Sequence, residues 1–177
     1  MKKCDFVIPE CFVETAMAQS FLNCDVNHQK GCNQVSRVMQ IKYENDFAIG
    51  MIDNDKRHST YVKEAKEICH SSHVIIKKLQ DKPHYFVVIN PAMEKFMIDV
   101  SSNGLSLKGY NLPIDLEGLK SITKDSKGMM FNADIRRFFA DKSNEENSEM
   151  HSLKKLLCYL CENKYNVKIE EVKKFLE

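Results

Sequence analysis

FAIGMIDNDK, residues 47–56, is an apolar run of strand length that ends abruptly in acidic residues. An unbroken apolar run bounded by polar residues is typical of a strand buried on both faces, as in parallel sheets. Residues 6–10, FVIPE, show the same pattern and end in Glu10. Because ligands bind at the carboxyl ends of the strands in such sheets, we expect Glu10, Asp53 and Asp55 to lie on one edge of one sheet. Three carboxylates placed there are within reach of a shared cation.

Helical patterns flank these two strands. Apolar residues recur at helical spacing over residues 11–22 and again over residues 32–44. Between them, residues 24–31 are polar and contain Gly31, which predicts a connecting loop with a brief strand near Val26. The alternation of strands and helices is that of an α/β protein.

Further along the chain, residues 60–70 predict a short helix, whereas residues 73–79 and 84–90 predict two strands. Most of the remaining chain has helical patterns. We therefore predict an α/β fold with a mostly parallel, Rossmann-like sheet that is flanked by helices. Residues 1–100 are expected to form the α/β core, and residues 101–177 a helical C-terminal extension packed on the same domain.

Composition narrows the class of protein. The chain has 177 residues, which is about one domain, with 26 basic and 25 acidic side chains and a net charge of +1. Because the chain is nearly neutral, any phosphate-binding surface is a local patch. No segment has the roughly 18 apolar residues of a membrane span, and Asp5, Pro9 and Glu10 interrupt any signal-peptide core. We therefore expect a cytoplasmic protein without a membrane partner.

Seven cysteines are scattered along the chain, and Cys158 and Cys161 form a close pair. The segment LLCYLCENK that holds them has helical periodicity, and no second Cys-x-x-Cys motif is present to complete a zinc site. Half of a zinc site and a redox motif remain as alternatives. The favoured interpretation is core packing in a reducing compartment.

Asp53-Asn54-Asp55 spaces two carboxylates so that both can turn toward one cation where a strand opens into a loop. Hard cations such as Mg²⁺ prefer oxygen ligands and are held by a few carboxylates, with phosphate completing the coordination. A solvated turn is the alternative interpretation, because Asp and Asn are common loop residues. The motif thus predicts a magnesium site at a strand end.

Cationic side chains and a histidine lie in two predicted loops, one after the strand that ends in Asp53 and one before the second helix. Lys56 and Arg57 directly follow the acids and are placed to contact a phosphate. His28 and Lys30 belong to the loop before the second helix, and helix N-termini bind anions readily. The alternative for each of these residues is an ordinary solvated loop. We retain all four as candidate phosphate ligands.

These acids carry a resemblance to a known family. The N-terminal half, about residues 4–90, resembles the TOPRIM fold, the metal-binding domain of topoisomerases, primases, small ribosomal-RNA maturases and OLD-family nucleases. That family opens with an apolar strand ending in Glu and later has a strand ending in Asp-x-Asp, matched here by Glu10 and by GMIDND. It often has Glu-Gly-x-x-Asp at the first strand, where this chain has Glu14 as the second acid and Cys11 in place of the glycine.

The resemblance implies Mg²⁺ or Mn²⁺ as the cofactor and Glu10, Asp53 and Asp55 as the catalytic residues. Asp53 and Asp55 would anchor one or two ions, Glu10 would bind a second ion or act as general acid or base, and Glu14 would join the metal ligands. Small TOPRIM-like proteins of defence systems carry a further acid in a Pro-x-x-Glu segment, which Glu94 resembles. A favourable interaction with a helix dipole is the alternative role of Glu94.

Three functions fit these features. The first is a magnesium-dependent nuclease or phosphoryl-transfer protein acting on nucleic acid, in the bacterial defence or genome-maintenance setting that the family implies. The second is a non-catalytic TOPRIM-like module that binds metal, nucleotide or a partner ATPase, which the near-neutral charge favours. A flavodoxin-like or receiver-like domain ranks last, because no phosphorylatable Asp with a downstream Thr and Lys stands out. The apolar stripe of the C-terminal helices predicts core packing or, alternatively, contact with a partner protein.

Overall fold

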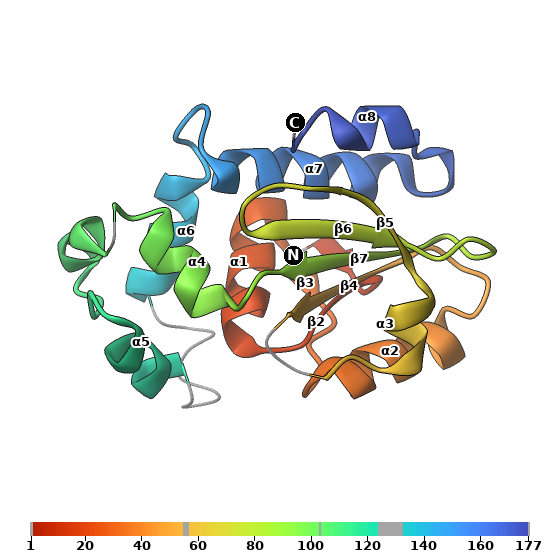
Figure 1. Ribbon diagram of the computed structural model, residues 1–177, viewed down its shortest axis with the longest axis horizontal. Helices are drawn as coiled ribbons and strands as arrows, with labels where there is room; N and C mark the ends of the chain where they lie inside the picture. Colours follow the sequence, from red (N-terminus) through yellow and green to blue (C-terminus); the bar gives the residue numbers. More distant parts are fainter. Residues whose placement is uncertain (1, 55–56, 103, 124–132, 177) are drawn as a thin grey trace.

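The strands of one mixed sheet run through the middle of the molecule (Figure 1). The computed structural model describes residues 2–54, 57–102, 104–123 and 133–176. The sheet has five strands in the order β2-β4-β7-β6-β5. In that order they are β2 (Val7–Pro9), β4 (Ala48–Asp53), β7 (His84–Ile89), β6 (Val74–Lys78) and β5 (Lys66–His70).

The direction of the strands changes across this sheet. β2, β4 and β7 are parallel to one another, whereas β6 is antiparallel to β7 and β5 is antiparallel to β6. A smaller parallel sheet pairs β1 (Lys2–Cys4) with β3 (Cys24–Val26). Just after β3, Asn27 N donates to Val7 O at 2.9 Å and Gln29 N donates to Pro9 O at 2.9 Å, so the chain leaving β3 lies beside β2. The protein is therefore an α/β protein, but its main sheet is mixed.

Helices cover both faces of the sheet and make up most of the C-terminal region. In Figure 1, α7 and α8 lie on one side of the sheet and α2 and α3 on the other, while α4, α5 and α6 gather at one end. The helices are α1 (Phe12–Leu22), α2 (Cys32–Lys42), α3 (Thr60–Glu64), α4 (Met93–Asp99), α5 (Leu116–Thr123), α6 (Ala133–Lys142), α7 (Glu149–Asn163) and α8 (Ile169–Lys173), with 3₁₀ helices η1 (Leu105–Tyr110) and η3 (Lys164–Asn166).

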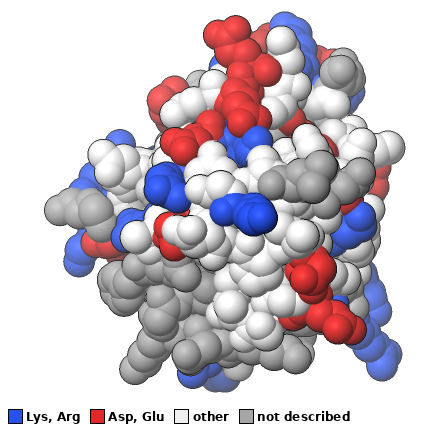
Figure 2. Space-filling view, turned by 90° about the vertical axis from the view of Figure 1, so that its left-hand side faces the viewer, with Lys and Arg blue, Asp and Glu red and all other residues white. Residues whose placement is uncertain are grey.

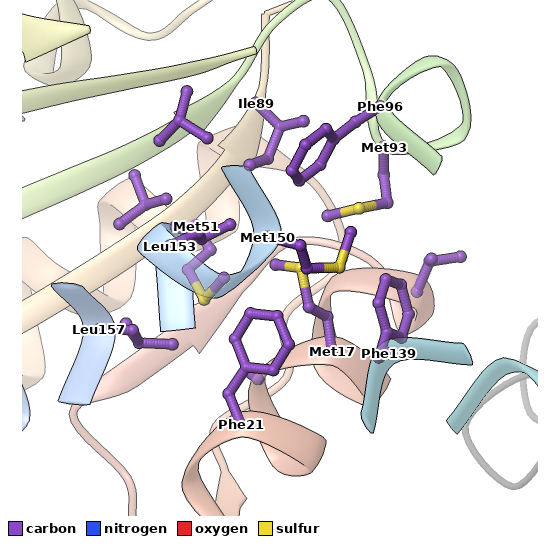
Figure 3. Packing of buried hydrophobic residues seen from close by; sticks show 14 of the residues in the cluster. Met17, Phe21, Met51, Ile89, Met93, Phe96, Phe139, Met150, Leu153 and Leu157 are labelled. Carbon is purple, nitrogen blue, oxygen red and sulfur yellow. The ribbon is translucent and has the colours of Figure 1, made fainter. Parts of the chain in front are cut away.

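The sheet separates two apolar clusters, because successive residues of a strand point to opposite faces. In β4, Ile49 and Met51 belong to the larger cluster, whereas Ala48 and Ile52 belong to the smaller one, which also takes in residues of α2 and α3. Figure 3 shows the larger cluster where α1, α4, α6 and α7 meet the sheet. Its labelled side chains are Met17, Phe21, Met51, Ile89, Met93, Phe96, Phe139, Met150, Leu153 and Leu157. The continuous apolar runs of the sequence therefore correspond to strands covered on both faces.

The prediction of a helix over residues 60–70 is wrong in its second half. α3 ends at Glu64, and Ala65 takes an extended conformation with ψ of 127°. Residues Lys66–His70 then form β5 at the edge of the sheet, paired with β6. Helical spacing within so short a segment is weak evidence, because the ladder bonds to β6 satisfy the same backbone groups that a longer helix would.

Other predicted elements agree with the structure. The strands predicted over residues 73–79 and 84–90 correspond to β6 and β7, and the helix predicted over residues 32–44 corresponds to α2. The brief strand near Val26 is β3. None of the helices in the described ranges combines the length and the apolar content that a bilayer span requires.

Candidate functional site

Glu10 and Asp53 lie at the same edge of the main sheet, as the sequence predicts. β2 and β4 are adjacent and parallel, and Pro9 is paired with Met51. Glu10 directly follows β2, and its N–H donates to Met51 O at 3.0 Å. Asp53 is the last residue of β4. Both carboxylates are buried, with exposed fractions of 2% for Glu10 and 6% for Asp53.

Glu14 joins this edge from the first turn of α1. Its Oε2 accepts hydrogen bonds from Glu10 N at 3.0 Å and from Cys11 N at 3.1 Å. Cys11 is the N-cap of the helix, and its Sγ accepts a hydrogen bond from Glu14 N at 3.5 Å. The pair is a capping box with sulfur in the place usually taken by a Ser or Thr oxygen. Glu14 thus holds the backbone at Glu10 in position.

Cys11 occupies the position where the TOPRIM pattern has glycine. Its φ of −135° and ψ of 172° are extended backbone, which any residue adopts. A cysteine is therefore accommodated at this position without backbone strain.

The acids of this edge influence one another electrostatically. Glu14 is fully buried. Burial, followed by the charges of Asp53 and Glu10, raises the pKa of Glu14 well above its ordinary value. Glu14 Oε1 is buried and has no hydrogen-bond partner within the described ranges. Negative charge at this edge is therefore costly, and a bound proton or a cation would relieve the repulsion.

Asp53 connects the edge to the start of α4. Its Oδ1 accepts a hydrogen bond from Met93 N at 3.0 Å. On the other side, His58 Nε2 lies 3.1 Å from the backbone oxygen of Asp53. Asn54 N donates to Ile89 O at 2.8 Å, which holds the residue after β4 against the end of β7. These contacts hold the end of β4, with Asp53, against the end of β7 and the start of α4.

Glu94 lies one residue beyond Met93, in the first turn of α4. Its Oε1 accepts a hydrogen bond from Thr123 Oγ1 at 2.6 Å. That bond joins α4 to the last residue of α5. Glu94 therefore follows the residue that bonds to Asp53, but its own carboxylate helps to pack α4 against α5.

The loop with His28 and Lys30 lies beside the acidic edge. Gly31 N donates to Glu10 O at 3.0 Å, which fixes the end of this loop to β2. The His28 ring stacks on Phe12 with 4.1 Å between ring centroids, and its Nδ1 lies 2.9 Å from Thr15 Oγ1. Burial lowers the pKa of His28, so the imidazole is neutral at pH 7. His28 therefore packs against α1, whereas Lys30 is exposed to solvent.

The remaining predicted residues follow β4. Arg57 is exposed to solvent. Asp55 and Lys56 lie outside the described residues. Of the five predicted metal ligands, the structure thus brings Glu10, Glu14 and Asp53 together at one edge and leaves Glu94 engaged with α5.

The oxygen donors of this edge suit a hard cation. Within the described ranges, no group of three His, Cys, Asp or Glu side chains is arranged to hold a metal ion. Mg²⁺ differs from structural zinc in this respect, because one or two carboxylates commonly hold it, with water and substrate phosphate completing the octahedron. Glu10 and Asp53 would supply two such carboxylates, and the unpartnered oxygen of Glu14 lies beside them.

Two features of the site were not predicted from the sequence. The cap formed by Cys11 and Glu14 is one, and its signal is the Cys-x-x-Glu spacing, which matches the Ser-x-x-Glu of a capping box. The other is the backbone N–H of Met93, which bonds to Asp53. No local pattern reveals this contact, because it joins residues forty positions apart.

Cys158 and Cys161 lie on α7 and are half-buried, and Cys161 packs against the larger core cluster. Cys158 Sγ donates to Phe21 O at 4.0 Å. Burial raises the pKa of both thiols, which keeps them protonated and weakly reactive. All seven cysteines are free thiols.

Comparison of the chain with known family models, curated proteins and solved structures finds no match. What the site does has to follow from its own geometry and chemistry.

Proposed function

We propose that Glu10 and Asp53 hold Mg²⁺ or Mn²⁺ and that the protein uses this cation for phosphoryl transfer on nucleic acid, as a TOPRIM-like nuclease. One observation carries the proposal: two buried carboxylates end adjacent parallel strands, beside a third carboxyl group whose pKa is raised by burial and by the charges of these two. Perturbed acids gathered at one strand edge are a recurrent mark of functional sites.

The order of the elements supports the TOPRIM-like interpretation. Along the chain β2 is followed by α1, β3, α2 and β4, which is the order on which the resemblance rests. Glu10 and Asp53 stand at the ends of the first and last of these strands. The antiparallel strands β5 and β6 extend the sheet on the side away from the acids.

Each residue has a distinct role in the proposed chemistry. Bound at this edge, the cation would polarise a phosphate and lower the pKa of an attacking water. Glu10 and Asp53 hold it, and Glu14 fixes the backbone that carries Glu10. Met93 N and the end of β7 orient Asp53 and the residue that follows it. Arg57 and Lys30 are exposed cations available to a substrate phosphate.

The test compares cleavage and metal binding in matched variants. Single-stranded DNA, RNA and plasmid are incubated with Mg²⁺ or Mn²⁺ and with wild type, Glu10→Gln or Asp53→Asn. Both substitutions keep the side-chain shape and remove a buried charge, so we expect folded proteins whose cleavage rate falls by about 100-fold or more. Asp81→Asn is the control, because Asp81 is an exposed acid between β6 and β7, at the opposite end of β7. Equal cleavage by all four proteins would contradict the proposal.

A second candidate, a metal-binding module without turnover, is favoured by the burial of the carboxylates. Exposed fractions of 2% and 6% leave room for an ion more readily than for a polymer backbone. If this candidate is right, Mg²⁺ raises the melting temperature of wild type but not of Asp53→Asn, as expected for a ligand of the folded state. Cleavage would then be absent for every nucleic acid.

A further inference from the structure

A long stretch of the chain beside the acidic edge contains no carboxylate. Between Asp25 and Glu44 there is no Asp or Glu, although the whole chain has 25 acidic residues. The same stretch carries three cations, Lys30, Arg37 and Lys42. It also carries the amides Asn27, Gln29, Asn33, Gln34 and Gln40. In a chain of net charge +1, this is a local excess of positive charge and of hydrogen-bonding amides.

The fold shapes this stretch into a groove. A cavity of about 360 Å³ lies between the loop after β3 and the outer face of α2. Asn27 and Gln29 line it from the loop. Residues of α2 line the opposite wall, among them Arg37, Val38, Ile41 and Lys42. We call this cavity the α2 groove.

The side chains of the α2 groove are available to a ligand. Arg37 and Lys42 are exposed, and neither forms an ion pair within the described part of the chain. Gln29 Nε2 donates to Asn27 Oδ1 at 2.8 Å, which leaves the amide donors of Asn27 and the amide acceptor of Gln29 for a ligand. Ile41 is 70% exposed, which is unusual for a large apolar side chain.

We infer that the α2 groove binds single-stranded nucleic acid. Arg37 and Lys42 contact the phosphates, the amides of Asn27 and Gln29 reach the edges of unpaired bases, and Ile41 packs against a base face. The groove is concave, so it accepts a flexible strand, whereas reading of duplex DNA requires a helix or ribbon that enters the major groove. The absence of carboxylates from the lining makes the groove complementary to a polyanion.

The position of the α2 groove deepens the proposed function, on which this part of the inference rests. Gln29 in the groove wall bonds to Pro9 through its backbone, and Gly31 bonds to Glu10. The Gln29 end of the groove therefore adjoins the acidic edge, whereas its Lys42 end lies near the start of β7, where Tyr43 O is 3.0 Å from His84 Nε2. A strand bound along the groove has one end beside the acids. The end of the molecule with α4, α5 and α6 differs, because basic and acidic side chains are intermixed there (Figure 2).

Binding is measured without metal, so that it does not depend on cleavage. Fluorescence anisotropy of short labelled single-stranded DNA, single-stranded RNA and duplex DNA is recorded in EDTA for wild type and for the double variant Arg37→Ala/Lys42→Ala. We expect the double variant to bind single strands about 10-fold or more weakly and its salt slope to fall by about 1.4, because two phosphate contacts are lost. Ile41→Ser is expected to weaken binding at an unchanged salt slope, because it removes apolar contact alone.

The control is Lys120→Ala/Lys155→Ala, which removes two exposed lysines of α5 and α7. Retained affinity in this variant supports the inference, and a stronger signal with DNA or with RNA identifies the sugar. An equal loss of affinity in the control, or tighter binding of duplex than of both single strands, overturns it. If cleavage depends on Asp53 but binding is insensitive to Arg37 and Lys42, the α2 groove is refuted and the proposed function survives.

Discussion

Among single residues, Gly50 in the middle of β4 allows α2 to pack closely on the sheet. A Cβ at this position would lie 2.9 Å from atoms of Met39, Phe86 and Val35. Real Cβ contacts are essentially never so short, and all three neighbours are themselves fully buried. The missing side chain therefore allows α2 to lie against the strand that carries Asp53.

Gly50→Ala is expected to lower the free energy of unfolding by about 1–3 kcal/mol, because the added methyl overpacks the smaller core cluster. Urea denaturation followed by circular dichroism measures the change. Gly109→Ala is the matched control, since a Cβ at Gly109 meets no atom within 4 Å. A Gly50→Ala protein as stable as wild type would show that α2 moves outward without loss.

At the scale of the elements, His73 joins the sheet to the helices α4 and α7. It lies between β5 and β6. His73 Nδ1 lies 2.7 Å from Glu149 Oε2 at the start of α7, and Nε2 lies 2.8 Å from Asp99 Oδ2 at the end of α4. The ring also stacks on Phe96. Burial alone would lower the pKa of His73, but Glu149 and Asp99 outweigh it and raise that pKa above its ordinary value. The imidazolium therefore links the sheet to two helices.

The raised pKa of His73 predicts a pH-dependent loss of stability. A histidine whose pKa is higher in the folded than in the unfolded state stabilises fully below its unfolded value, and this contribution disappears as pH rises through the folded pKa. We expect His73→Gln to cost about 1–2 kcal/mol near pH 6 and clearly less near pH 9.

Urea unfolding of both proteins at the two pH values measures this difference for His73→Gln. His70→Gln is the control, because His70 is exposed and pairs with Glu67 on the surface. A cost for His73→Gln that does not change with pH would assign His73 a packing role through Phe96 instead of a charged one.

At the scale of the whole molecule, the N-terminal sheet and the C-terminal helices share one core. Leu153 and Leu157 of α7 pack in the same cluster as Met51 of β4 and Met17 of α1 (Figure 3). All four side chains are fully buried. Removing α7 would expose the sheet face on which they meet.

A chain ending at Ser143, which lacks α7 and α8, is expected to lose cooperative unfolding and to bind hydrophobic dyes, because its larger core cluster is open to water. A chain ending at Asn166, which lacks α8 alone, is the control and is expected to unfold cooperatively at lower urea. A sharp transition in the shorter chain, monitored by circular dichroism, would show that the α/β part folds alone.

Parts of this structure were predictable from local pattern and parts were not. The runs ending in Glu10 and Asp53 indicated buried strands with acids at one edge, because a strand covered on both faces must be apolar throughout. The strand over Lys66–His70 was not predictable in this way. No residue of β5 is fully buried, so the strand shows no clear alternation of apolar and polar residues, and its pairing with β6 is not encoded in its own spacing.

Sequence periodicity thus established the α/β class, and the acids that end two apolar runs identified Glu10 and Asp53 as the carboxylates to test. Both signals can be seen within short segments of the sequence. Packing alone settled the mixed strand directions, the bond from Met93 to Asp53, the groove along α2 and the link from His73 to Glu149. The bonds of Met93 and His73 join segments far apart in the chain. Their geometry arises from how the helices and strands fit together, and no local pattern carries that information.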